Sequence, residues 1–143
     1  MSTSTAAPGR VRAEIMDGID ATRDGKTLII VQSNTEKLFK VNRRGVTREI
    51  DLGGATVAGD GILLDGRKLY VVVRSPGDGV VVIRLRRNLN SGTVVRTITH
   101  PDPRLLSGPT TVDDFGRHLY VVNARFGTPM TPDTPYWVTK LSK

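Results

Sequence analysis

Two aspartates that precede a glycine, Asp17 and Asp60, are the residues of this sequence with the clearest capacity for chemistry. Carboxylate oxygens are ligands that Ca²⁺ prefers, and two carboxylates brought together could instead share one proton. The alternative is structural, because Asp-Gly is a favourable turn dipeptide. The same dipeptide recurs at Asp24, Asp65 and Asp78. We therefore keep both interpretations and treat Asp17 and Asp60 as candidate metal ligands.

Other kinds of catalytic chemistry find no support in the sequence. The chain has no cysteine, which excludes disulfides, thiolate metal sites and cysteine nucleophiles. His100 lies in a Pro-rich segment and His118 lies next to a turn, so neither fits a metal-ligand or catalytic-triad pattern. The sequence also lacks the glycine-rich motifs that bind phosphates at the start of a helix. Catalytic residues therefore stay unassigned.

A phrase that recurs three times predicts the fold. Each copy has a short strand, an Asp-Gly or Phe-Gly turn and a second strand rich in Val, Ile and Tyr, over about residues 16–58, 59–108 and 109–143. Glycine supplies the positive φ of a hairpin turn, and β-branched and aromatic residues fit the pleated strands. Two further strands are expected in each copy. Repeats of this length with four strands are typical of propeller blades.

We therefore predict an all-β protein with about three four-stranded β-propeller blades. Residues 10–143 form this partial propeller, with one spare strand expected in residues 10–15, and residues 1–9 form a flexible amino-terminal tail. Known propellers have about four to eight blades, so three blades cannot close a ring alone. Their uncovered faces and strand edges would pair with another chain. A homodimer that completes a six-bladed ring is the predicted assembly.

The start of the innermost strand in each repeat is the place where side chains would line the channel of a propeller. The first two repeats have an aspartate there, and the third has a pair of threonines, for which strand packing is an equal alternative. Two polar residues that follow the third buried strand could lie at one mouth of the channel or in a loop. The channel-lining candidates are Asp17, Asp60, Thr110, Thr111, Asn123 and Arg125.

Several phrases resemble the carboxyl-terminal half of SMP-30/gluconolactonase-type propellers, a six-bladed family. The resemblance covers about residues 16–141, and similar phrases occur in other six-bladed propellers. The phrases are Met16-Asp17-Gly18-Ile19, Asp24-Gly25-Lys26-Thr27-Leu28, Gly59-Asp60-Gly61-Ile62, Leu69-Tyr70-Val71-Val72 and Leu119-Tyr120-Val121-Val122-Asn123.

The resemblance implies a site on the propeller axis. In the lactonase branch of that family, a Glu, an Asn of an Asn-Gly phrase and an Asp of an Asp-Gly phrase hold a divalent metal. Asp17 would take the Asn-Gly position and Asp60 the Asp-Gly position, with Ca²⁺ as the expected metal. The Glu has no counterpart in this sequence. The implied set of ligands is therefore partial.

The charge and hydropathy of the chain limit the classes of partner that we expect. The net charge is +7, which could indicate a polyanion. However, only 5% of the residues are aromatic, and none is interleaved with the basic clusters at residues 43–48 and 84–87, so nucleic acid is not an expected partner. No apolar stretch is long enough for a membrane helix. Residues 1–8 lack the pattern of a secretory signal, which predicts a cytoplasmic location and leaves a secreted parent protein open.

Three functions fit these observations. The first is a binding or scaffold module that self-assembles and holds a small-molecule ligand or a metal in its channel. The second is a metal-dependent hydrolase of the lactonase kind, active when a dimer brings Asp17 and Asp60 of both chains around one axis. The third is a piece of a longer propeller with no role of its own. Fold alone does not choose among them.

Overall fold

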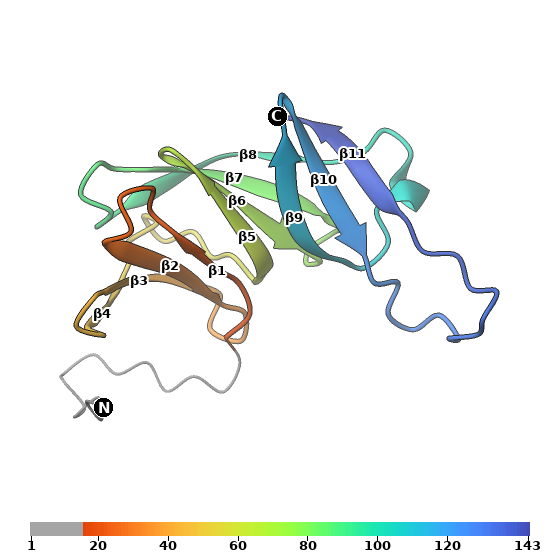
Figure 1. Cartoon of the computed structure of the whole chain (residues 1–143), viewed down its shortest axis with the longest axis horizontal. Coiled ribbons are helices and arrows are strands. Elements are labelled where there is room, and N and C mark those ends of the chain that lie inside the picture. The colour runs from red at the N-terminus through yellow and green to blue at the C-terminus, as the bar shows by residue number, and fades with distance from the viewer. Residues whose placement is uncertain (1–15) are drawn as a thin grey trace.

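The computed structural model describes residues 16–143, so the predicted tail at residues 1–9 and the predicted strand in residues 10–15 lie outside the described residues. Within residues 16–143, eleven strands form three antiparallel sheets that succeed one another along the chain (Figure 1). The fold is therefore all-β and built from propeller-type sheets, as the sequence predicts.

Each sheet follows the order of the sequence. Sheet 1 contains β1 (Ile19–Ala21), β2 (Thr27–Gln32), β3 (Lys37–Asn42) and β4 (Thr47–Glu49). Sheet 2 contains β5 (Gly59–Asp65), β6 (Lys68–Val73), β7 (Gly79–Leu85) and β8 (Gly92–Ile98). Sheet 3 contains β9 (Pro109–Phe115), β10 (His118–Asn123) and β11 (Val138–Ser142).

The first two strands of each sheet form a hairpin with a glycine in its turn. Gly25, Gly66 and Gly116 have φ values of 65°, 62° and 63°. Side chains with a Cβ are strained in this left-handed region, which is why glycine holds the position in all three repeats. The second strand of each hairpin is rich in Leu, Ile, Val and Tyr, and at least three of its six residues are buried. The predicted hairpins are thus present at all three places.

Sheet 3 differs from the expected blade because it has three strands rather than four within the described chain. Fourteen residues, 124–137, separate β10 from β11. Pro129, Pro132 and Pro135 lie in this segment, and proline cannot donate to a strand ladder. The segment is therefore an extended connection, and β11 remains as the outer edge of sheet 3.

Apolar side chains pack the sheets face to face in two layers. Ile29, Val31 and Leu38 of sheet 1 form one cluster with the facing side of sheet 2. Tyr70 and Val72, which lie on the other side of sheet 2, form a second cluster with sheet 3. Sheet 2 is therefore buried on both faces, which explains the nearly continuous apolar run at residues 69–73.

Among residues 16–143, one short helical element interrupts the strands, a 3-10 turn at Pro103–Leu105. Asp102 caps this turn by accepting a hydrogen bond from the backbone N–H of Arg104 at 3.0 Å. Within the described chain, no helix has the length and apolar character needed to cross a membrane.

Candidate functional site

The first strands of the three sheets lie side by side, with β5 between β1 and β9. Their backbones approach most closely at glycines. A methyl group on Gly18 would lie 2.3 Å from the carbonyl oxygen of Asp60, and one on Gly61 would lie 2.6 Å from that of Thr110. Asp17, Asp60, Thr110 and Thr111 therefore form one row across the three sheets, which we call the axial row.

The turn interpretation of the two Asp-Gly phrases is wrong. Gly18 and Gly61 do not have the positive φ of the turn glycines. The backbone N–H of Asp17 donates to the carbonyl oxygen of Val31 at 3.2 Å and extends the β1–β2 ladder, while Asp60 lies inside β5. Glycine follows each aspartate because two inner strands must pass closely there.

Asp60 is engaged by a residue that the sequence analysis did not select. Nη1 of Arg74 donates to Oδ2 of Asp60 at 2.6 Å and approaches the carbonyl oxygen of Pro109 at 3.4 Å. The same guanidinium lies over the ring of Phe126, 5.2 Å from its centroid. Arg74, directly after β6, thereby connects β5 with the start of β9. The signal in the sequence is a charged residue at the end of a buried apolar run.

The other members of the axial row are more accessible. Asp17 is exposed, and its carboxylate has no hydrogen bond or ion pair to any residue in 16–143. Thr110 is half-buried and Thr111 is exposed. The Thr111 hydroxyl lies only 2.7 Å from the place where a Cβ on Gly61 would be, so this threonine packs over the glycine.

The axial row of one chain does not fit the Ca²⁺ site that the family resemblance implies. Among residues 16–143, no three acidic or histidine side chains lie close enough together to hold a metal ion. Asp60 is already paired with Arg74. A guanidinium beside a ligand oxygen repels a second cation, and Ca²⁺ needs about six to eight oxygen ligands. We therefore assign no reaction step to a metal.

Asn123 supports sheet 3 rather than facing a channel, which corrects the expectation from the sequence. Its side chain is buried. Its Nδ2 donates to the carbonyl oxygen of Trp137 at 3.2 Å and to Oγ1 of Thr139 at 2.9 Å, and its Oδ1 accepts the N–H of Ser107 at 2.9 Å. A buried amide that bonds to both Trp137 and Thr139 fixes β10 against β11.

The contacts of Arg125 are likewise with the connection between β10 and β11. Its Nη1 donates to the carbonyl oxygen of Pro135 at 2.6 Å, and its guanidinium lies 4.7 Å from the ring centroid of Trp137. Trp137 in turn donates from its indole to the carbonyl oxygen of Leu105 at 2.9 Å. Arg125 therefore organises the loop, the alternative that the sequence analysis kept for it.

A second residue missed from the sequence joins sheets 1 and 2. Oδ2 of Asp20 accepts the backbone N–H of Leu64 at 2.6 Å, and its Oδ1 accepts that of Ala21 at 2.7 Å. Asp20 follows the apolar Ile19 in β1, and this departure from an apolar strand was the available signal. The contact holds β1 against β5 close to the axial row.

Asp102 and Lys143 are among the groups whose pKa values are shifted by hydrogen bonds in the structure. Hydrogen bonds from Arg104 lower the pKa of the Asp102 carboxyl to about 2, at the exposed cap of the 3-10 turn. Lys143 donates to Asp114 and to Asp65, and these bonds raise the pKa of its ammonium group. Lys143 thereby links sheets 2 and 3. The Asp102 shift comes from the cap of the 3-10 turn, and the Lys143 shift comes from ion pairs that connect two sheets.

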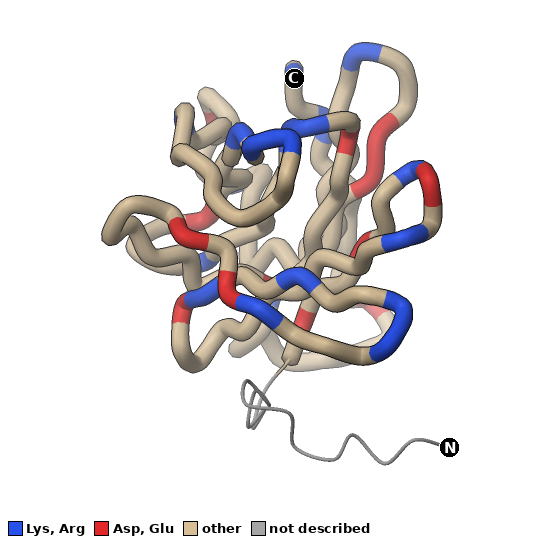
Figure 2. Tube along the Cα trace, turned by 90° about the vertical axis from the view of Figure 1, so that its left-hand side faces the viewer, with Lys and Arg blue, Asp and Glu red and all other residues tan. Residues whose placement is uncertain are grey.

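Lys and Arg segments lie among Asp and Glu segments along the Cα trace in Figure 2.

Comparisons with known proteins identify the fold. No protein-family model matches the sequence, and no curated protein matches it. A solved luciferin-regenerating enzyme superposes with a TM-score of 0.64 at 18% identity, over 92% of this chain and 46% of that one. Kuenenia stuttgartiensis hydrazine synthase gives 0.61 at 20% identity, over 87% of this chain and 33% of that one. The periplasmic gluconolactonase of Pseudomonas aeruginosa gives 0.55 at 20% identity, over 76% and 36%.

The chain thus has the fold of a portion of a β-propeller, and its resemblance to the SMP-30/gluconolactonase-type propellers is confirmed at the level of the fold. It spans less than half the length of each of these solved structures. At such low sequence identity the likeness concerns architecture alone.

Proposed function

We propose that this chain is a self-assembling propeller module, in which two copies close head to tail into a six-bladed ring that binds a small ligand on its axis. The observation that carries the proposal is the exposure of apolar positions on the two outermost sheet faces. The same positions are buried wherever another sheet of the chain covers them. This comparison can be made position by position, because β2, β6 and β10 each have six residues.

The face of sheet 1 that points away from sheet 2, which we call the leading face, exposes apolar side chains at Leu28 and Ile19, although Gln32 at the end of β2 is buried. The second residue of β2, β6 and β10 is always leucine, and it faces the preceding sheet. Leu69 and Leu119 are 0% exposed, whereas Leu28 is 38% exposed. The residues that pair with the fourth residue of β2, β6 and β10 on the neighbouring strand show the same contrast in exposed fraction. They are Ile19 at 61%, Ile62 at 7% and Val112 at 5% exposed.

The face of sheet 3 that points away from sheet 2, the trailing face, also exposes apolar side chains. The fifth residue of β2, β6 and β10 is always valine, and it faces the following sheet. Val31 and Val72 are 0% exposed, whereas Val122 is 41% exposed. Their cross-strand partners show the same contrast. They are Leu38 at 0%, Val80 at 0% and Val138 at 56% exposed.

A second copy of the chain would cover both faces at once. Inside the chain, each leading side packs on the trailing side of its neighbour, so the leading face of one copy matches the trailing face of another. Two such contacts close a ring with twofold symmetry. The chain covers 46% of the luciferin-regenerating enzyme, so two copies supply about the length of that protein. Burial of each apolar side chain would contribute about 1.5–3 kcal/mol.

The closed ring would repeat the axial row twice around one axis. It would then bring together two copies each of Asp17, Asp60 and Arg74, with threonine hydroxyls between them. Fixed charges of both signs favour a small polar ligand over a divalent cation, because each guanidinium compensates a carboxylate. A binding or scaffold role is therefore better supported than the lactonase alternative, which needs an uncompensated metal site.

The molar mass in solution tests the assembly. We expect light scattering after size exclusion to give a dimer for the unmodified protein. Leu28→Asp on the leading face and Val122→Asp on the trailing face should each raise the dimer dissociation constant at least 100-fold, because a charge buried between sheets is strongly unfavourable. A folded monomer at all concentrations would contradict the proposal.

The matched control is Val95→Asp. Val95 is a similarly exposed valine, at 49%, but it lies in β8 of the central sheet, outside both end faces. This variant should remain dimeric, and circular dichroism should show that all variants are folded. Loss of the dimer in Val95→Asp to the same extent would point to a contact unrelated to the end faces.

A further inference from the structure

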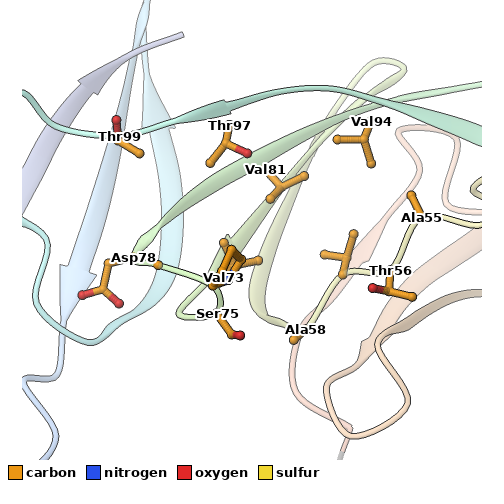
Figure 3. A pocket seen from close by; sticks show the side chains of 13 residues that line it. Ala55, Thr56, Ala58, Val73, Ser75, Asp78, Val81, Val94, Thr97 and Thr99 are labelled. Atoms are coloured by element: carbon orange, nitrogen blue, oxygen red, sulfur yellow. The ribbon is translucent and has the colours of Figure 1, made fainter.

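A cavity of about 500 Å³ opens where sheets 1 and 2 meet, and no residue of the axial row lines it (Figure 3). Its sides are the connection at residues 55–58, the turn at residues 75–78 and strands β7 and β8 of sheet 2. The volume falls in the range of about 300–1,000 Å³ that is typical of small-molecule sites.

The cavity exists because sheet 1 covers only one end of β8. The connection after β4 contacts the start of β8, where the N–H of Asp51 donates to the carbonyl oxygen of Asn90 and the N–H of Gly92 donates to that of Asp51, both at 2.9 Å. Strand β4 has three residues, whereas β8 has seven. The far end of β8, near Thr97, is therefore left without a covering strand.

The walls of the cavity are apolar. Val73 and Val81 lie on the side of sheet 2 that faces sheet 1, and Val94 lies beside them on β8. Val57 of the connection closes the opposite wall and is itself almost fully buried. Four valines on two facing walls favour a flat or compact hydrocarbon body.

The rim carries hydroxyl groups and one charge. Figure 3 shows Thr97 and Thr99 along one side, Ser75 across from them and the Asp78 side chain at one end, with its carboxylate directed away from Val73. Of the 13 lining residues, Asp78 alone is charged, although the chain as a whole has a net charge of +7. The absence of Lys and Arg from the lining disfavours anionic ligands and leaves Asp78 to recognise a cation.

The Asp78 carboxylate is fixed by a hydrogen bond that uses one of its two oxygens. Its Oδ2 accepts the backbone N–H of Gly108 at 3.0 Å, which fixes the carboxylate. Its Oδ1 has no hydrogen-bond donor among the residues that the structure describes. A half-buried carboxylate at the end of an apolar cavity attracts a cation more strongly than one in open water.

We infer that this cavity binds a small molecule with an apolar body and a protonated amine, the body between the valine walls and the amine on Asp78. The site lies wholly within one chain, so it goes beyond the proposed ring and does not depend on it. The hydroxyl groups of the rim would face the polar end of the ligand.

Three probes that share one body and differ in the head group test this inference. They are 2-naphthylmethylamine, 2-naphthylmethanol and 2-naphthoate. Titration calorimetry or ligand-observed NMR at neutral pH should show the amine binding at least tenfold more tightly than the alcohol, with no binding of the carboxylate. Failure of all three to bind at millimolar concentration, or equal binding of the carboxylate, would overturn the inference.

Two variants and a control locate the binding. Asp78→Asn keeps an acceptor for Gly108 and should reduce amine affinity to that of the alcohol. Val94→Trp should fill the cavity and abolish binding of both, whereas Val95→Trp, on the adjacent exposed residue, should leave it unchanged. Unaltered affinity in Val94→Trp would place the probes elsewhere. Leu28→Asp should bind normally even as a monomer, so failure of the ring and failure of this site are distinguishable.

Discussion

At the scale of single residues, Arg74 determines the local charge of the axial row. Its guanidinium pairs with Asp60 and lies over Phe126, so a fixed cation stands beside one of the two carboxylates that the sequence singles out. Asp17, which holds the position of Asp60 in the first repeat, has no such partner among the described residues. The two aspartates therefore differ in chemistry although they occupy the same place in their repeats.

The Arg74–Asp60 pair can be measured with a double-mutant cycle of Arg74→Met and Asp60→Asn. We expect a coupling of about 0.5–1 kcal/mol in urea unfolding at fixed protein concentration, since the side chains are 43% and 28% exposed and solvent screens the pair. The coupling should fall in 1 M salt.

The Lys37–Glu49 pair provides the control for this cycle, because both side chains are about half exposed. Its coupling should be smaller, at roughly 0.2–0.5 kcal/mol. A coupling for Arg74 and Asp60 no larger than this control would show that the ion pair does not organise the axial row.

At the scale of elements, the inner strands pack on one another through glycine. Gly18 meets the backbone of Asp60, and Gly61 meets the backbone of Thr110 and Thr111. Because backbone atoms cannot move aside as a flexible side chain can, these two positions set the distance between neighbouring sheets. They also explain why Asp-Gly is repeated there.

The variant Gly61→Ala tests this packing. Its Cβ would lie 2.6 Å from both the carbonyl oxygen of Thr110 and the Cα of Thr111, so we expect about 1–3 kcal/mol loss in the free energy of unfolding. The control is Gly77→Ala, where a Cβ meets nothing within 4 Å and φ is not positive. It should change stability by no more than about 0.5 kcal/mol. Equal effects of the two substitutions would refute the close-packing role.

At the scale of the whole molecule, the row of three sheets has two end faces, which carry apolar side chains at the same positions as the interfaces between the sheets. Leu28 and Ile19 are exposed on one end, and Val122 and Val138 on the other. A head-to-tail ring joins unlike faces, whereas a dimer formed through two leading faces joins like ones. Mixing variants separates these arrangements.

Mixed Leu28→Asp and Val122→Asp proteins should form a heterodimer although neither forms a homodimer, because one contact in the mixed pair still joins two intact faces. We expect native mass spectrometry of an equimolar mixture to show this species, with weaker association than in the unmodified dimer. A mixture that stays monomeric while the unmodified protein is dimeric would contradict head-to-tail closure.

Much of the architecture could be predicted from local patterns. Gly25, Gly66 and Gly116 mark hairpin turns because positive φ is a local property of the chain. The run at residues 69–73 indicates a strand buried on both faces, and the structure places it in the central sheet. The third sheet was less predictable, since the proline-rich segment 124–137 takes the place of a strand only through its path in three dimensions.

The sequence by itself determined the hairpins, the repeat and the propeller-type fold, because turn glycines and β-branched runs act over a few residues. Only the tertiary structure decided which Asp-Gly phrases are turns, that Arg74 reaches Asp60, and that Asn123 is buried. These facts depend on contacts between strands of different sheets, such as β5 with β9, which local sequence does not encode. The pocket at Asp78 has the same origin, since it arises where β4 ends before β8 does.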